Sequence, residues 1–235
     1  TKNWKGNKYT GPTSTCEAVR IRSVYGAEIA GGFTGLMEAA DTASAGNLSL
    51  LWGLVKADNI LGAHIPYEGA IGTSIAKVFD MTVASTGLPG KRLRQAEINY
   101  MSSTIHPASH AGYYPDAMPM SIKITFDPKT GKLYGGQIVG YDGVDKRIDE
   151  IALVIKHEGT VYDLMKVEQA YAPPFCSAKD PVAVAGYVAE NIITGKVQPV
   201  YWRQLRDIEM ENNFLLDVRT HDEFSLNTLP GAVNI

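Results

Sequence analysis

The stretch that decides the fold is 122–141, which reads IKITFDPKTGKLYGGQIVGY. Its first five residues alternate apolar and polar side chains, which predicts a half-buried strand. Asp127–Gly131 then has the Asp-Pro pair and late glycine of a turn, and Leu133–Tyr141 returns as a second strand. We therefore predict a β-hairpin. Within its return strand, the pair Gly135-Gly136 predicts a bulge or a close approach of another backbone segment.

Two further strands are predicted before this hairpin. One carries apolar residues at a period near two and ends at Gly87–Gly90, where the Leu-Pro pair lies between two glycines. Its markers are Ile75, Phe79, Met81 and Val83. The other is predicted to run from Arg94 to Ile105.

Helices are predicted after the strands. Asp145 is expected to cap a helix that ends before Gly159, and Thr160 a short helix through about Lys166. Asp180 followed by Pro181 predicts the start of a third helix, whose apolar spacing continues to Gly195. Strands followed by helices indicate an antiparallel β-sheet flanked by helices, an α+β fold.

The chain divides into three predicted parts. Residues 1–69 lack clear element boundaries, residues 70–197 hold the α+β module, and residues 198–235 begin a third unit. The composition is that of a globular protein, with 45% hydrophobic and 20% charged residues. A net charge of −3 without a basic run argues against nucleic acid or an anionic membrane as partner.

The longest apolar stretches, such as Leu48–Val55, are too short to cross a bilayer, which needs about 20 residues. We also expect no signal peptide before the first domain. The two cysteines, Cys16 and Cys176, do not make a disulfide framework. The expected location is therefore a reducing cytoplasm.

A glycine cluster at 30–35 is similar to a dinucleotide-binding fingerprint, with Gly32 and Gly35 as candidate cofactor-binding residues. Ala30 stands at the first glycine position, and no acidic residue follows at the spacing that contacts a ribose. A structural glycine turn is the alternative interpretation, and it needs neither feature.

Two loops carry the other candidate residues. The first places His106 and His110 beside Tyr113 and Tyr114, without a third ligand at metal-binding spacing. Its tyrosines fit either the edge of a core or a surface that presents phenol groups. The second loop, Tyr171–Asp180, contains a Pro-Pro pair that restricts its backbone. It is compatible with a binding surface or with a stiff connector.

The cysteines are weak candidates for redox chemistry. Cys16 precedes an acidic residue, which raises a thiol pKa, and reactive thiolates sit near cations or helix N-termini. Cys176 follows the proline pair and fits a small buried apolar position.

Three segments, Gly72–Asp80, Gly136–Gly140 and Tyr171–Asp180, resemble the C-terminal dimerisation domain of flavin-dependent pyridine nucleotide-disulfide reductases. The resemblance spans about residues 57–197, and its nearest branch is coenzyme A-disulfide reductase in the form fused to a rhodanese domain. The tail, Leu215–Phe224 and Leu229–Ile235, resembles the opening of that rhodanese domain. It stops before the cysteine that carries persulfide in such domains, so we expect no sulfur transfer by the tail.

Residues 1–69 depart most from the family pattern. A complete member has a flavin-binding fingerprint and a redox cysteine in an Asn-Cys-Gly setting, and neither is found here. Residues 26–40 resemble the nicotinamide fingerprint with the changes described above. We interpret 1–69 as an incomplete remnant of the FAD- and NAD-binding region.

The resemblance implies roles for three residues. Tyr171 matches a tyrosine that reaches across the dimer toward the partner's flavin and active-site sulfur. Tyr113 resembles a second tyrosine at that site, and Lys179 matches a lysine that contacts coenzyme A. Cys176 stands where relatives often have serine and is given no catalytic role.

Three functions are compared. By resemblance, the protein is a homodimeric FAD enzyme that uses NADH or NADPH to reduce coenzyme A disulfide or persulfide. The second reading is a dimerisation or binding module without activity of its own. The third, a sulfur carrier using the rhodanese segment, is the least supported because the persulfide cysteine is not in the sequence.

Overall fold

The computed structural model describes residues 58–66, 69–201, 204–207 and 213–235. The predictions for Gly32, Gly35 and Cys16 lie outside these residues. The described chain contains a sheet-and-helix domain and, from Val197 on, a separate compact unit.

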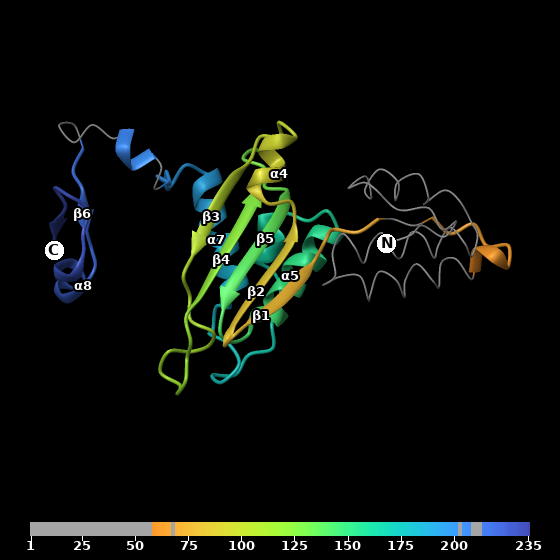
Figure 1. Cartoon of the computed structure of the whole chain (residues 1–235), viewed down its shortest axis with the longest axis horizontal. Helices are drawn as coiled ribbons and strands as arrows, with labels where there is room; N and C mark the ends of the chain where they lie inside the picture. Colours follow the sequence, from red (N-terminus) through yellow and green to blue (C-terminus); the bar gives the residue numbers. More distant parts are fainter. Residues whose placement is uncertain (1–57, 67–68, 202–203, 208–212) are drawn as a thin grey trace, which may run out of the picture. The chain divides into compact units, whose positions relative to one another are not determined.

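The domain is built on a five-stranded antiparallel sheet with the strand order β1-β2-β5-β4-β3 (Figure 1). The strands are β1 Ser74–Val78, β2 Met81–Gly87, β3 Met101–Ile105, β4 Met120–Phe126 and β5 Leu133–Gly140. The predicted hairpin is β4 and β5, joined by the turn at Asp127–Gly131. Asp127 Oδ1 accepts hydrogen bonds from the amides of Lys129 and Thr130, which explains why a local signal identified this turn.

Two predicted strands were wrong in extent. The segment from Ile75 to Val83 is a hairpin, because the chain reverses at Phe79-Asp80 and Val78 pairs with Met81. The prediction failed because Phe79 is apolar and fits the spacing of a continuing strand. Its φ is 54°, a turn conformation that is rare for a bulky residue. The strand predicted from Arg94 begins only at Met101, because helix α4 (Gly90–Gln95) occupies the segment after Pro89 and buries Leu93.

Both expectations for Gly135-Gly136 are confirmed. Thr125 pairs with Gly135 while Phe126 pairs with Leu133, so the return strand carries one extra residue, a β-bulge. A Cβ at Gly135 would lie 2.5 Å from the carbonyl oxygen of Leu88. The strand is thus kept free of side chains where another backbone crosses it.

The helices α5 (Val144–Lys156), α6 (Val161–Leu164) and α7 (Pro181–Ile193) follow the sheet. Gly143, in the left-handed region, is the N-cap of α5, and Asp145 lies in the first turn instead of capping it. Thr160 caps α6 as predicted, but this helix ends at Leu164. Asp180 caps α7 as predicted, because its Oδ1 accepts a hydrogen bond from the amide of Val182 at 2.9 Å.

The core lies between one face of the sheet and helices α5 and α7 (Figure 1). Ala84, Ile138 and Ile122 form a cross-strand row on this face, and Ile148 and Ile151 of α5 are fully buried over the sheet. The fold class predicted from the sequence is therefore confirmed for this part of the chain.

The unit from Val197 contains a 3-10 helix (Gln204–Asp207), strands β6 (Leu216–Asp217) and β7 (Val233–Asn234), and helix α8 (His221–Leu226). The two strands pair in parallel. A capping box of Thr220 and Glu223 begins α8, and no residue of this helix is buried. The proposed start of a rhodanese domain stays a prediction.

Candidate functional site

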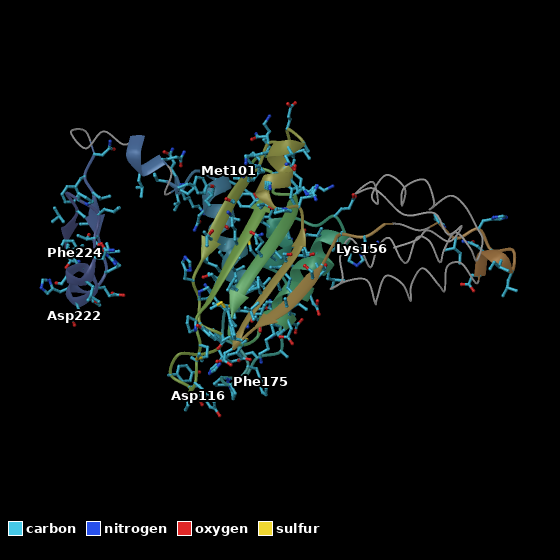
Figure 2. All side chains as sticks on the ribbon, in the orientation of Figure 1. Met101, Asp116, Lys156, Phe175, Asp222 and Phe224 are labelled. Atoms are coloured by element: carbon cyan, nitrogen blue, oxygen red, sulfur yellow. The ribbon has the colours of Figure 1, made fainter. Side chains whose placement is uncertain are left out.

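Two tyrosines distant in sequence meet at one end of the domain. Tyr113 lies in the loop between β3 and β4, and Tyr171 lies in the segment between α6 and α7. Their hydroxyl oxygens are 3.4 Å apart, although 58 residues separate them. Both side chains are accessible, with 78% of Tyr113 and 52% of Tyr171 exposed. Figure 2 shows the same end of the domain through Asp116 and Phe175, one from each segment.

The contact further favours the protonated form of Tyr171. The hydrogen bond with Tyr113 raises the pKa of Tyr171, and partial desolvation adds to this effect. When one hydroxyl donates to the other, the hydrogen of the accepting hydroxyl remains available to a ligand. The pair can therefore donate a hydrogen bond to a group placed beside it.

The loop that carries Tyr113 is held by its own hydrogen bonds. His110 Nε2 donates to the carbonyl oxygen of Pro115 at 2.9 Å, because a carbonyl can only accept. Ser109 Oγ accepts from the amide of Met118 at 3.0 Å and lies 3.1 Å from His110 Nδ1. His106 Nδ1 also lies 2.9 Å from Ser121 Oγ. Both histidines of this loop therefore make contacts that hold the loop in place.

The segment that carries Tyr171 turns tightly at its proline pair. The amides of Phe175 and Cys176 donate to the carbonyl oxygen of Ala172 at 2.8 and 3.1 Å. Cys176 is 1% exposed, its Sγ donates to the carbonyl oxygen of Ser177, and burial raises the pKa of its thiol. A buried, protonated thiol is a poor nucleophile, so the structure gives Cys176 a packing role.

Lys179 lies on the same segment and is exposed. Its Nζ is 5.2 Å from the centroid of the Tyr187 ring, a cation–π contact. The ammonium group is therefore at the surface, oriented over the first turns of α7.

Arg147 is a residue of this region that sequence reasoning missed. Its side chain is fully buried, and its Nε and Nη2 donate to the two carboxylate oxygens of Asp180 at 3.2 and 3.0 Å. Nη1 donates to the carbonyl oxygen of Gly143 at 2.9 Å, and Nη2 also donates to that of Ser109 at 2.7 Å. The sequence does contain a feature that indicates such a role. Arg147 lies four residues before Ile151, on the apolar face of the helix, where a buried charge requires a partner.

Among the described residues, no three histidine, cysteine, aspartate or glutamate side chains are grouped to hold a metal ion. Within the same part of the chain, no helix has the length and hydrophobicity needed to cross a membrane.

The class of the domain follows from comparison with known proteins. Residues 73–180 match the family described as the pyridine nucleotide-disulphide oxidoreductase dimerisation domain. The predicted resemblance to this dimerisation domain and the predicted fold class are therefore confirmed over residues 73–180.

Two known enzymes are similar to the chain over a longer stretch than this domain. Coenzyme A disulfide reductase of Staphylococcus epidermidis is 34% identical over 147 residues, covering 60% of this chain and 33% of the relative. The enzyme of the same name from Staphylococcus aureus is 33% identical over 150 residues, covering 61% of this chain and 34% of its own length. The chain therefore spans about one third of the length of these relatives.

Two solved structures are similar to the chain. The crystal structure of reduced Bacillus anthracis CoADR-RHD has a TM-score of 0.76 and 46% identity, covering 80% of this chain and 34% of that one. The structure of an NAD-dependent persulfide reductase from A. fulgidus has a TM-score of 0.73 and 31% identity, covering 81% and 34%.

Proposed function

We propose that this chain is part of a homodimeric FAD- and NAD(P)H-dependent enzyme that reduces coenzyme A disulfide or persulfide in the cytoplasm. Its described domain would supply the dimer interface and place Tyr113 and Tyr171 at the sulfur site of the partner. The observation that carries the proposal is the 3.4 Å approach of two accessible tyrosine hydroxyls from separate segments. The names of the similar proteins support the substrate class.

The tyrosines fit a site where sulfur leaves as a thiolate. A phenol beside the sulfur can donate a hydrogen bond or a proton to the departing thiolate. Tyr171 suits this role because its side chain is accessible and a phenol carries its proton at neutral pH. Tyr113 contacts that hydroxyl and orients it.

FAD, when bound, supplies two-electron transfer between the nicotinamide and the disulfide. Among the described residues, Tyr171 is the proposed neighbour of the flavin, because its side chain is accessible and the contact with Tyr113 restrains the direction of its hydroxyl. Gly32 and Gly35 remain the proposed contacts of the nucleotide phosphates, from outside the described residues.

Lys179 is proposed to bind a phosphate of coenzyme A. Its ammonium group is exposed, and a cation facing a phosphate makes a charge-assisted contact. Lys179→Gln should raise the KM for coenzyme A disulfide while kcat changes little. Lys129→Gln, which removes an exposed charge from the β4–β5 turn, is the matched control. An equal KM in the two variants would rule out a contact between Lys179 and the substrate.

The test of the tyrosine role uses a complete reductase with Phe at the positions matching Tyr113 and Tyr171. We expect disulfide reduction to slow by about 100-fold, the lower range for a general acid, with flavin reduction by the nicotinamide unchanged. Normal turnover in both variants would rule the role out.

The second candidate is a dimerisation or binding module without activity of its own. It is favoured by the burial of Cys176, the single cysteine among the described residues, because a buried thiol is poorly placed for redox chemistry. An absorbance spectrum of the purified chain from 300 to 550 nm, with its intact mass, separates the two. A flavin band supports the enzyme, and its absence at the correct mass supports the module.

A further inference from the structure

We infer that Arg147 is the positioning residue that sets the separation of Tyr113 and Tyr171. The consequence for catalysis rests on the proposed function, whereas the geometric part concerns this chain alone. Arg147 touches neither tyrosine, so its effect passes through the two segments that carry them.

The guanidinium group joins those two segments directly. Nη2 donates to the carbonyl oxygen of Ser109, four residues before Tyr113, and to Asp180, nine residues after Tyr171. These two bonds, of 2.7 and 3.0 Å, share one nitrogen. The planar fork of arginine therefore fixes both segments to the first turns of α5 in one geometry.

Each segment transmits this position because it is itself restrained. On the first side, Ser109 and His110 close the loop through Met118 and Pro115. The amide of Tyr114 also donates to the carbonyl oxygen of Ala111 at 2.9 Å, next to Tyr113.

On the second side, the proline pair limits the backbone, and the turn at Ala172 directs Cys176 into the interior. Asp180 ends the segment as the N-cap of α7, with Oδ1 shared between Arg147 and the amide of Val182. A shift of Asp180 would therefore move the start of α7 as well.

The backbone beside the Arg147 side chain leaves space for its guanidinium group. The absence of a side chain at Gly143 leaves room for Arg147 Nη1, which a Cβ at this position would displace. A buried ion pair is weak evidence for stability, since desolvation offsets much of the attraction. A role in specifying one arrangement of the loops accounts for a full-length charged side chain in the core.

The experiment measures the tyrosine contact in the 235-residue chain by photo-oxidation with a ruthenium complex and persulfate. Loss of one electron and one proton from each ring lets the two tyrosines join as dityrosine. The cross-linked peptide containing Tyr113 and Tyr171 is quantified by mass spectrometry, and Tyr113→Phe and Tyr171→Phe show the background.

The main variant is Arg147→Met with Asp180→Asn, which removes both charges and leaves an amide oxygen to cap α7. We expect a severalfold loss of the Tyr113–Tyr171 cross-link in the folded variant. Ile151→Ala, also buried in α5 but packed on the sheet, is the control for lost stability and should keep the wild-type yield. Wild-type yield in a folded double variant would overturn the inference.

Arg147→Lys covers the case in which the double variant does not fold. It keeps a charge for Asp180 but lacks the fork that also reaches Ser109, so the cross-link should again decrease. An unchanged yield would count against the inference. In a complete reductase, the corresponding substitution should lower kcat by up to about 100-fold, the effect of a 1 Å misplacement, with less change in KM.

The two proposals fail in different ways. If the cross-link decreases while Tyr→Phe variants of a complete reductase keep full turnover, Arg147 positions the pair and the proposed catalytic role is wrong. If the cross-link is unchanged while those variants are slow, the catalytic role stands and Arg147 does not position the tyrosines.

Discussion

Gln169 donates a hydrogen bond from Nε2 to Glu150 Oε2 at 3.1 Å, which attaches the segment before Tyr171 to helix α5. Glu150 is half-buried, and burial raises the pKa of its carboxyl group above the usual 4.5 despite this bond. The charged form of Glu150 therefore opposes folding.

Glu150→Gln should stabilise the protein at neutral pH. Because the folded pKa is raised, Glu150 contributes stability below the unfolded pKa, and this is lost as pH rises through the folded value. The substitution avoids this loss and keeps an oxygen for Gln169. We expect a gain of about 0.5 kcal/mol at pH 7, limited by solvent screening, and none below pH ~4. Urea unfolding at both pH values measures it, and a pH-independent difference would contradict the assignment.

Gly136→Ala should destabilise the domain through its contact with α5. A Cβ at Gly136 would lie 2.8 Å from Ile151 Cγ2, in the closed core. Overpacking of this kind costs about 1–3 kcal/mol. Thermal unfolding should show a lower Tm, whereas Gly112→Ala, with nothing within 4 Å, should be near wild type. In a double-mutant cycle, Ile151→Ala should partly compensate Gly136→Ala. Additive losses would mean that another contact is responsible.

The carboxyl group of Asp217 should titrate at about 2. Hydrogen bonds from the side chain and amide of Arg219 lower its pKa to this value, with a smaller effect from Thr228. Because the folded pKa is depressed, the stabilisation is present above the usual 3.8 and is lost as pH falls through about 2. Carbon NMR of the carboxyl group measures the value, and Arg219→Gln should return it toward 3.8. Titration near 3.8 in the wild type would contradict the described contacts.

The chain should sediment as a dimer, with a mass near twice 25.5 kDa. This follows from the family that residues 73–180 match, which is described as a dimerisation domain. Sedimentation equilibrium at several micromolar concentrations tests it, and a monomer throughout would reject the homodimer.

Several features were predictable because their causes are local. The β4–β5 hairpin was identified from alternation and from a turn that Asp127 stabilises through its nearest amides. The start of α7 was identified from Asp180 and Pro181, whose effects reach only the first turn. The division of β1 from β2 was missed, because Phe79 is apolar and its positive φ leaves no pattern in the sequence.

The candidate site shows the same difference. The sequence by itself determined the α+β class, the β4–β5 hairpin and the caps of α6 and α7, and family resemblance singled out Tyr113, Tyr171 and Lys179. Only the tertiary structure decided that the two tyrosine hydroxyls meet and that Arg147 joins Ser109 to Asp180. Turn and cap preferences act over a few residues, whereas these contacts span 33 to 58 positions and form when the helices pack on the sheet.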